Sequence, residues 1–74
     1  KMASKKVELI IPGALKGEPI FYHIIKSFDV IPNIIEASFS TDMGWAIVQF
    51  KGKAKELDKL FSFLNQKGVR VNLR

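Results

Sequence analysis

The chain has 74 residues and a mass of 8.4 kDa, which allows one compact domain and excludes most enzyme classes by size. Apolar residues make up 47% of it and charged residues 26%, a composition typical of globular rather than disordered proteins. Cysteine is absent, so disulfides and thiolate-bound metal centres are excluded. The net charge of +5 is spread along the chain, which favours a solvated surface over a nucleic-acid footprint.

The start of the chain and its hydropathy set the expected domain boundaries. Lys1 precedes Met2, so residues 1–5 are expected to be a tag remnant or a disordered start, and residues 6–74 a single domain. No apolar run approaches the ~20 residues that cross a bilayer, and no charged-then-apolar leader opens the chain. We therefore expect a soluble chain without direct membrane insertion and without an export signal.

The first two elements are expected to be a strand and a helix. In residues 6–11, Val7, Leu9 and Ile11 alternate with other residues, and a Pro-Gly pair follows. Pro19 suits the first turn of a helix that runs to about residue 28, because this turn does not use the N–H that proline lacks. Apolar residues at helical spacing form one expected buried stripe, namely Ile20, Phe21, Ile24, Ile25 and Phe28.

Residues 30–40 and 45–51 are expected to form an antiparallel hairpin. Pro32 requires an edge position or a strand that begins after it. The connection between the two strands is short, polar and contains Gly44, which is typical of a hairpin. In the first of these strands the alternating apolar residues are Ile35, Ala37 and Phe39.

The remaining elements are expected to be a helix and a strand. Gly52 is expected to end the preceding strand, and Gly68 is placed to terminate the helix in a left-handed conformation. Alternation in residues 69–74 predicts the final strand. The helix carries an apolar stripe, namely Ala54, Leu57, Leu60, Phe61 and Leu64. The order predicts an α+β ferredoxin-like βαββαβ sandwich, a four-stranded antiparallel sheet with two helices on one face.

This fold leaves one face of the sheet without helices. Small Ala46 suits the crowded helix side, so Trp45 and Ile47 are expected on the open face, in an apolar patch with Ile34. Such patches usually mark an interface; the alternative is that Trp45 lies under a loop. We expect a second copy to cover Trp45 and Ile47, through sheet surfaces or strand edges, because dimerisation adds burial that one small core lacks.

Residues suited to catalysis are few. His23 is the only histidine, and on the solvent side of the first helix a surface role is more frequent than that of a base or ligand. The acidic residues belong to separate elements or to a solvated helix face, which argues against a two-carboxylate site. Phosphate loops, nucleophile elbows and metal-ligand spacings do not occur. We therefore predict a domain that is not an enzyme and that holds no metal or cofactor.

Residues 43–50, MGWAIVQF, resemble the RNP1 pattern of RNA-recognition motifs, on the third strand where that pattern belongs. Met43 stands in place of the expected cation and Ile47 in place of a second aromatic, and the first strand offers Ile10 where another aromatic would stack. One aromatic contributes only ~1–3 kcal/mol of stacking. The resemblance implies an RNA-binding module that uses Trp45, which we keep as the alternative function.

A longer resemblance covers nearly the whole chain. Its features, in order, are the proline that opens the first helix, an aromatic-polar-valine sequence at residues 28–30, the triplet Asn33, Ile34 and Ile35, then Ala37 and the glycines on either side of the third strand. This set resembles the NIL domain, a ferredoxin-like regulatory module of methionine-importing ABC transporter ATPases and of some ferredoxin-type proteins. The short hairpin is similar to that of the ferredoxin-linked or free-standing members.

The NIL resemblance implies a homodimeric, non-catalytic regulatory domain that binds an amino acid, which is methionine in the transporter members. By match to the motif, Asn33 is the polar ligand contact, with Ile34 and Ile35 beside it. An amide offers a donor and an acceptor to an amino acid, and apolar neighbours suit a thioether; alternatively, Asn33 fixes the turn into its strand. The implied partners are an ABC transporter ATPase, at the cytoplasmic face of the membrane, or a ferredoxin domain, and nucleic acid is not expected.

Overall fold

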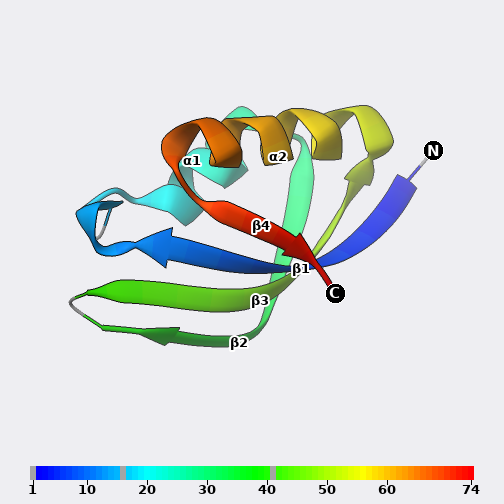
Figure 1. Cartoon of the computed structure of the whole chain (residues 1–74). Helices are drawn as coiled ribbons and strands as arrows, with labels where there is room; N and C mark the ends of the chain where they lie inside the picture. The colour runs from blue at the N-terminus through cyan, green and yellow to red at the C-terminus, as the bar shows by residue number, and fades with distance from the viewer. Residues whose placement is uncertain (1, 16, 41) are drawn as a thin grey trace.

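The computed structural model describes residues 2–15, 17–40 and 42–74. The elements are β1 (Met2–Pro12), a 3₁₀ turn (Gly13–Leu15), α1 (Ile20–Ser27), β2 (Val30–Phe39), β3 (Met43–Lys53), α2 (Ala54–Lys67) and β4 (Arg70–Leu73). The strands form an antiparallel sheet in the order β2-β3-β1-β4, and both helices lie on one side of it (Figure 1). The predicted ferredoxin-like α+β sandwich is therefore confirmed.

The core lies between the helices and the two central strands. Every second residue of β3 from Gly44 to Gly52 is buried, and alternating residues of β1 share this face. The period of two follows from strand geometry, which points successive side chains to opposite faces. The buried apolar residues are Val7, Leu9, Ile11, Ile20, Ile24, Val30, Ala46, Val48, Phe50, Leu57, Leu60, Leu64 and Val69.

Both central strands are longer than the alternation predicted. β1 begins at Met2, and residues 2–5 pair with the end of β3. They belong to the sheet, because β3 continues far enough to give their backbone groups a partner, which corrects the expected disordered start. Gly52 does not end β3 either. It is buried opposite Val30, where an added Cβ would lie 3.0 Å from the Asp29 carbonyl oxygen.

The second helix ends as predicted at Gly68, which has a φ of 93°. The Gly68 N–H donates to the Asn65 carbonyl at 3.0 Å, and the Val69 N–H donates to the Leu64 carbonyl at 2.9 Å. These two bonds satisfy carbonyls that the last turn would otherwise leave unpaired. Glycine is suited to this position because a Cβ disfavours the left-handed conformation.

The buried stripes of both helices are narrower than predicted. In α1, Ile20 and Ile24 are buried, but Ile25 is 57% exposed. In α2, Leu57, Leu60 and Leu64 are buried, whereas Ala54 is exposed at the first helical position. Helical spacing gives only the direction of a side chain. The side chains of Ile25 and Ala54 point beyond the area that the sheet covers.

Strand β2 forms an edge of the sheet, as Pro32 requires. It pairs with β3 and contains a β-bulge: Ile34 lies opposite Val48 and Glu36 opposite Ile47, so Ile35 is the additional residue. Val30 is the one residue of β2 that is buried. Most of this strand therefore keeps its side chains in contact with solvent on both faces.

Glu56 connects the start of β2 to α2. The Asp29 N–H donates to Glu56 Oε1 at 3.0 Å, and Lys59 Nζ lies 3.5 Å from Glu56 Oε2. The bond from the Asp29 N–H is the main reason why the pKa of Glu56 lies below its ordinary value, and Lys59 adds to the effect. The carboxylate thus holds the entry into β2 against the first turn of α2.

Candidate functional site

The structure does not bring the motif residues Asn33, Ile34 and Ile35 together on one face. Asn33 lies opposite Gln49 on the open face, Ile34 lies opposite Val48 on the helix side, and Ile35 is the additional residue of the bulge. All three are exposed. A ligand that contacts Asn33 from the open face therefore meets other neighbours than the motif suggests.

The surroundings of Asn33 form a shallow hollow of about 380 Å³, which we call the polar hollow. Its lining residues are Ile31, Pro32, Asn33, Gln49 and Lys51. The Gln49 side-chain amide donates to the Ser4 hydroxyl at 2.8 Å, which leaves the Gln49 amide oxygen as an acceptor. The polar hollow thus offers two amides and an ammonium beside apolar side chains.

Trp45 and Ile47 lie on the face of the sheet that has no helices, and both are half-buried by their neighbours. Ile10 lies directly opposite Trp45, and we call Ile10, Trp45 and Ile47 the open-face cluster. The expectation that Ile34 joins this patch is wrong. Ile34 pairs with Val48 and therefore lies on the opposite side of the sheet.

Charged side chains surround the open-face cluster. The register places Lys6 and Arg70 on the same face, and Glu8 forms an ion pair with Arg74 at 3.6 Å. Of the three apolar residues in the cluster, Trp45 alone is aromatic. For a nucleic acid, the cluster would therefore provide one stacking ring with nearby cations.

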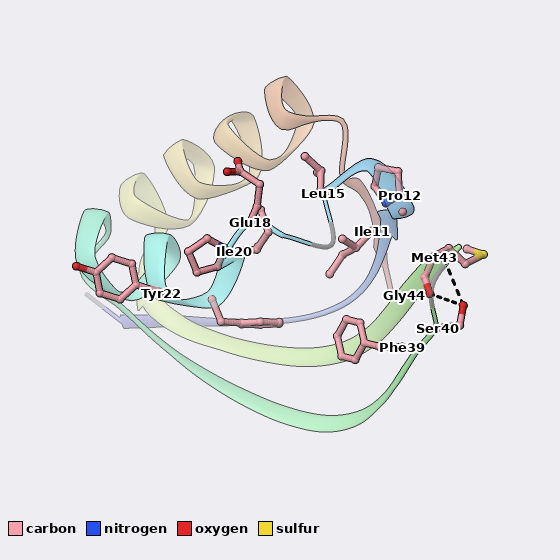
Figure 2. A pocket seen from close by; sticks show the side chains of 13 residues that line it. Ile11, Pro12, Leu15, Glu18, Ile20, Tyr22, Phe39, Ser40, Met43 and Gly44 are labelled. Atoms are coloured by element: carbon pink, nitrogen blue, oxygen red, sulfur yellow. Dashed lines mark hydrogen bonds between the residues drawn. The ribbon is translucent and has the colours of Figure 1, made fainter.

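A larger hollow, absent from the sequence-based predictions, lies on the helix side of the sheet. It measures about 540 Å³ and lies between the segment leading into α1 and the hairpin that joins β2 to β3 (Figure 2). We call it the apolar pocket. Its main apolar lining residues are Ile11, Leu15, Ile20, Phe21, Phe39 and Met43, and the polar residues Glu18, Tyr22 and Ser40 also line it.

One wall of the apolar pocket is the ring of Phe39, which is 60% exposed. The ring lies over Gly44, and a Cβ at Gly44 would overlap it. The Ser40 hydroxyl donates to the Met43 carbonyl at 3.0 Å and holds the hairpin beside this wall. Gly44 is the residue in the sequence that could have pointed to this pocket. A glycine in a short connection, however, predicts a hairpin and not a pocket.

Glu18 and Lys67 form an ion pair at the rim of the apolar pocket. Lys67 Nζ donates to Glu18 Oε1 at 2.9 Å, and Figure 2 shows the Glu18 carboxylate on the side of the pocket that faces α2. The hydrogen bond from Lys67 is the main reason why the pKa of Glu18 lies below its ordinary value. The rim therefore carries a negative and a positive charge side by side at neutral pH.

Other sequence candidates are placed as follows. His23 is half-buried and packs against the ring of Tyr22, with 5.6 Å between ring centroids.

Among residues 2–15, 17–40 and 42–74, no group of three His, Cys, Asp or Glu side chains is arranged to hold a metal ion. In the same part of the chain, neither helix has the length and apolar character of a membrane span.

Comparisons with known proteins identify the relatives of this chain. The family model of the NIL domain matches residues 5–72. Methionine import ATP-binding protein MetN 4 of Oceanobacillus iheyensis is 32% identical over 63 residues, which cover 80% of this chain and 18% of the relative. The chain therefore spans less than a fifth of that relative's length.

A solved structure extends the comparison to the fold. The crystal structure of the C-terminal domain of an ABC transporter / ATP-binding protein from Enterococcus faecalis matches with a TM-score of 0.80 and 22% sequence identity, over 93% of this chain and 81% of that one. At this identity the likeness is one of fold. The match of the NIL model, by contrast, runs from β1 to β4, and this chain therefore belongs to the NIL domain family.

Proposed function

We propose that this chain is a regulatory domain of an ABC transporter ATPase, and that it binds an amino acid, methionine first, without catalysing a reaction. Membership of the NIL family and a relative named as a methionine import ATP-binding protein support the proposal. The observation that carries the ligand part is the polar hollow, where the motif residue Asn33 lies beside Gln49 and Lys51.

The chemistry of the polar hollow suits a free amino acid. The Lys51 ammonium attracts an α-carboxylate, and the amide oxygens of Asn33 and Gln49 accept hydrogen bonds from an α-ammonium. Ile31 and Pro32 line the polar hollow and are proposed as apolar contacts for the ligand side chain. Ile34 lies on the opposite side of the sheet and cannot share this ligand, so of the two isoleucines in the motif only the exposed bulge residue Ile35 is kept as a proposed contact. The hollow is shallow, so a second copy of the chain would help to exclude water from the ligand.

We propose that the domain acts as a homodimer with Trp45 and Ile47 at the interface. Both residues lie on the uncovered sheet face, and a partner there would add burial to a small core. The edge of β2 is the alternative contact within this proposal. Ile34 and Phe39 are 51% and 60% exposed on that strand, and an apolar edge is a ready template for pairing with another chain.

The proposed partner is the remainder of a transporter ATPase, with a ferredoxin-type protein as the alternative. The relative that supports the first partner is more than five times as long as the matched region. In such a complex the domain would work at the cytoplasmic face of the membrane. Ligand occupancy in the domain would then report the internal amino-acid level to the transporter.

Isothermal titration calorimetry with L-methionine and a panel of other amino acids tests the ligand. We expect heat with L-methionine, and Asn33→Ala should weaken binding at the polar hollow about tenfold through loss of hydrogen bonds to charged groups. Asn65→Ala, on the exposed side of α2, is the matched control and should bind like the wild type. If no amino acid gives heat, the ligand part of the proposal is refuted, and the domain is then an interaction module that binds no amino acid.

Light scattering at high micromolar concentration tests the dimer and its contact. Trp45→Lys should give a monomer if the open face is the interface, and Ile34→Lys should do so if the β2 edge is the interface. Each variant is the control for the other. A strict monomer of the wild type, with and without ligand, would remove the dimer from the proposal.

RNA binding is the second candidate, and Trp45 on an open face with Lys6 and Arg70 is the observation that favours it. Titration of Trp45 fluorescence with single-stranded RNA at two salt concentrations separates it from the first proposal. RNA binding requires quenching and a steep loss of affinity with salt. Unchanged fluorescence at low salt would exclude it.

A further inference from the structure

Strand β1 is paired along its whole length on one side and along part of its length on the other. Each residue of β1 has a partner in β3, whereas among the described residues β4 pairs with residues 7–10. The Arg74 N–H adds one bond, to the Lys6 carbonyl at 2.9 Å. Figure 1 shows the first part of β1 continuing beyond the end of β4. Residues 2–5 therefore leave one strand edge open, which we call the β1 edge.

The bond to Lys6 determines which backbone groups point out of the β1 edge. In a strand, the N–H and C=O groups of one residue point to one side and those of the next residue to the other. Because the Lys6 carbonyl points to β4, the backbone groups of Ser4 and Met2 point the same way. Those of Ala3 and Lys5 point to β3. In the part of the chain that the structure describes, no backbone group pairs with Ser4 or Met2 on this side.

The strand side chains around the β1 edge are cationic. Lys6, Lys51 and Lys53 lie on the open face of the sheet at this end, and all three are exposed. Glu8, the acidic residue of β1, is already held by Arg74 in an ion pair at 3.6 Å. Exposed lysines attract carboxylates on a neighbouring strand, since opposite charges stabilise cross-strand pairs.

The same lysines argue against a second copy of the chain as the occupant of the β1 edge. Two such edges paired with each other would bring Lys6 of each copy, and Lys5 beside it, close to the same residues of the other. Like charges across strands are destabilising, and lysines at strand edges are a common protection against pairing between copies. The charge pattern therefore selects a strand of opposite charge.

The backbone groups argue against a nucleic acid at the β1 edge. Phosphates accept hydrogen bonds and donate none, so a phosphate backbone would leave the Ser4 and Met2 carbonyls without a donor. An extended polypeptide presents donors and acceptors in the alternation that a strand edge requires. Strand addition of this kind takes affinity from backbone bonds and specificity from alternate side chains.

We propose that the β1 edge binds an extended acidic segment of a partner protein, which joins the sheet in line with β4. The backbone of this segment pairs with Ser4 and Met2. Its carboxylates lie on the open face beside Lys6 and Lys51, and an apolar residue between them packs beside half-buried Ala3. The inference goes beyond the proposed function, because it uses neither Asn33 nor a dimer.

The first experiment measures the fluorescence anisotropy of a labelled, acetylated peptide of sequence EVEVE at low salt. Its first two glutamates pair with Ser4 and Met2, so that the carboxylates share the open face and the first valine faces Ala3. N-methylation of these two glutamates keeps the charges but removes the amide donors, and it should weaken binding at least about tenfold. The peptide KVKVK, with the opposite charge, should not bind.

Variants of Ser4 test the backbone pairing. Ser4→Pro removes the N–H that points away from β3, and proline is tolerated where a strand edge is open. It should weaken binding of EVEVE at least about tenfold. Ser4→Ala keeps the N–H and loses only the hydroxyl that accepts from Gln49, so it is the matched control and should bind like the wild type.

Charge reversal tests the electrostatic contribution and does not depend on the proline variant. Lys6→Glu should weaken binding of EVEVE about tenfold. Arg70→Glu is the matched control, because it makes a similar change in net charge on the same face but at the other end of β4. It should weaken binding less than about twofold, since screening limits its reach.

Amide hydrogen exchange reports on the β1 edge itself. In the chain without peptide, the Ser4 N–H should exchange faster than the Lys5 N–H, which points to β3. The peptide should slow exchange at Ser4 more than at Lys5, because only the first of these amides gains a partner.

The outcomes separate the occupants. Binding that N-methylation, Ser4→Pro and Lys6→Glu all weaken supports the site. If Lys6→Glu weakens binding and N-methylation does not, charge alone holds the peptide and strand addition is refuted. Self-association that Ser4→Pro abolishes and Ser4→Ala preserves would mean that a second copy covers the edge. Single-stranded RNA that displaces the peptide, or no binding at low millimolar peptide, would also overturn the proposal. Asn33→Ala should bind the peptide like the wild type, so none of these results affects the proposed function.

Discussion

Val48 and Ile34 lie opposite each other on neighbouring strands and share the helix side of the sheet, yet Val48 is completely buried and Ile34 is 51% exposed. Phe50 and Phe39 repeat the contrast, with exposed fractions of 0% and 60%. Strands β2 and β3 are both rich in apolar residues, so the difference lies in what covers them. On the helix side of the sheet, Val48 and Phe50 of β3 stabilise the fold, whereas Ile34 and Phe39 of β2 are available for binding.

The largest effect that tests this contrast is expected from Phe50→Ala. The ring is fully buried and contacts the edge of the Phe61 ring, with centroids 6.2 Å apart. Its removal should lower the free energy of unfolding by about 3–5 kcal/mol, through lost burial and a cavity. Urea unfolding followed by circular dichroism measures the loss. A change below about 1 kcal/mol would show that β3 is less essential than its burial indicates.

A paired substitution at facing positions gives the next effect. Val48→Ala should lower the free energy of unfolding by about 2 kcal/mol, because it removes fully buried methyl groups. Ile34→Ala removes a larger part of its side chain and should still cost less than about 1 kcal/mol, since half of that side chain is already in water. Both are measured in dilute solution, where chain association is weak. Equal losses would contradict the contrast between the strands.

Gly52→Ala tests the close contact between β3 and the start of β2. An added Cβ would lie 3.0 Å from the Asp29 carbonyl oxygen and 3.1 Å from Val30 Cγ1, and we expect a loss of about 1 kcal/mol from overpacking. Gly17→Ala is the control, because an added Cβ there meets nothing within 4 Å. In thermal unfolding, Gly52→Ala should be less stable than Gly17→Ala. If Gly52→Ala is as stable as the control, the backbone at the start of β2 can shift to accommodate the added methyl group.

The smallest effect concerns the attachment of β2 to α2 through Glu56. The Asp29 N–H lowers the pKa of Glu56 below its ordinary value of 4.5, so the carboxylate stabilises the fold above that pH. This contribution is lost as the pH falls through the lower pKa of the folded state. Glu56→Gln should reduce stability at neutral pH and flatten the decline below about pH 4.5.

Unfolding measured between pH 7 and pH 3 gives the two slopes for Glu56→Gln and the wild type. Glu36→Gln, on the exposed part of β2, is the control for removal of one negative charge. Parallel profiles for Glu56→Gln and the wild type would show that the bond to Asp29 does not contribute.

The order of the elements could be predicted because the local patterns have direct physical causes. Alternation in β3 corresponds to side chains on opposite faces, and small Ala46 correctly indicated the helix side. The extent of coverage could not be predicted in the same way. Ile25 has the correct helical spacing but is exposed, because spacing gives a direction and not the reach of the neighbouring element.

The candidate sites were predictable only in part. The motif singled out Asn33, but its neighbours depend on strand pairing, which brings Gln49 and Lys51 beside it. The bulge at Ile35 leaves no mark in an alternating pattern, and the face of Ile34 was therefore predicted wrongly. The apolar pocket escaped prediction because Ile11, Leu15 and Phe39 come from three separate segments.

The bulge at Ile35 determines which side of the sheet each part of β2 faces. Asn33 and Phe39 are six residues apart, and in a regular strand such residues share a face. The additional residue Ile35 sends them to opposite faces, so a single strand lines both the polar hollow and the apolar pocket. A strand without this additional residue would present Asn33 and Phe39 on the same face and could not line a hollow on each side of the sheet.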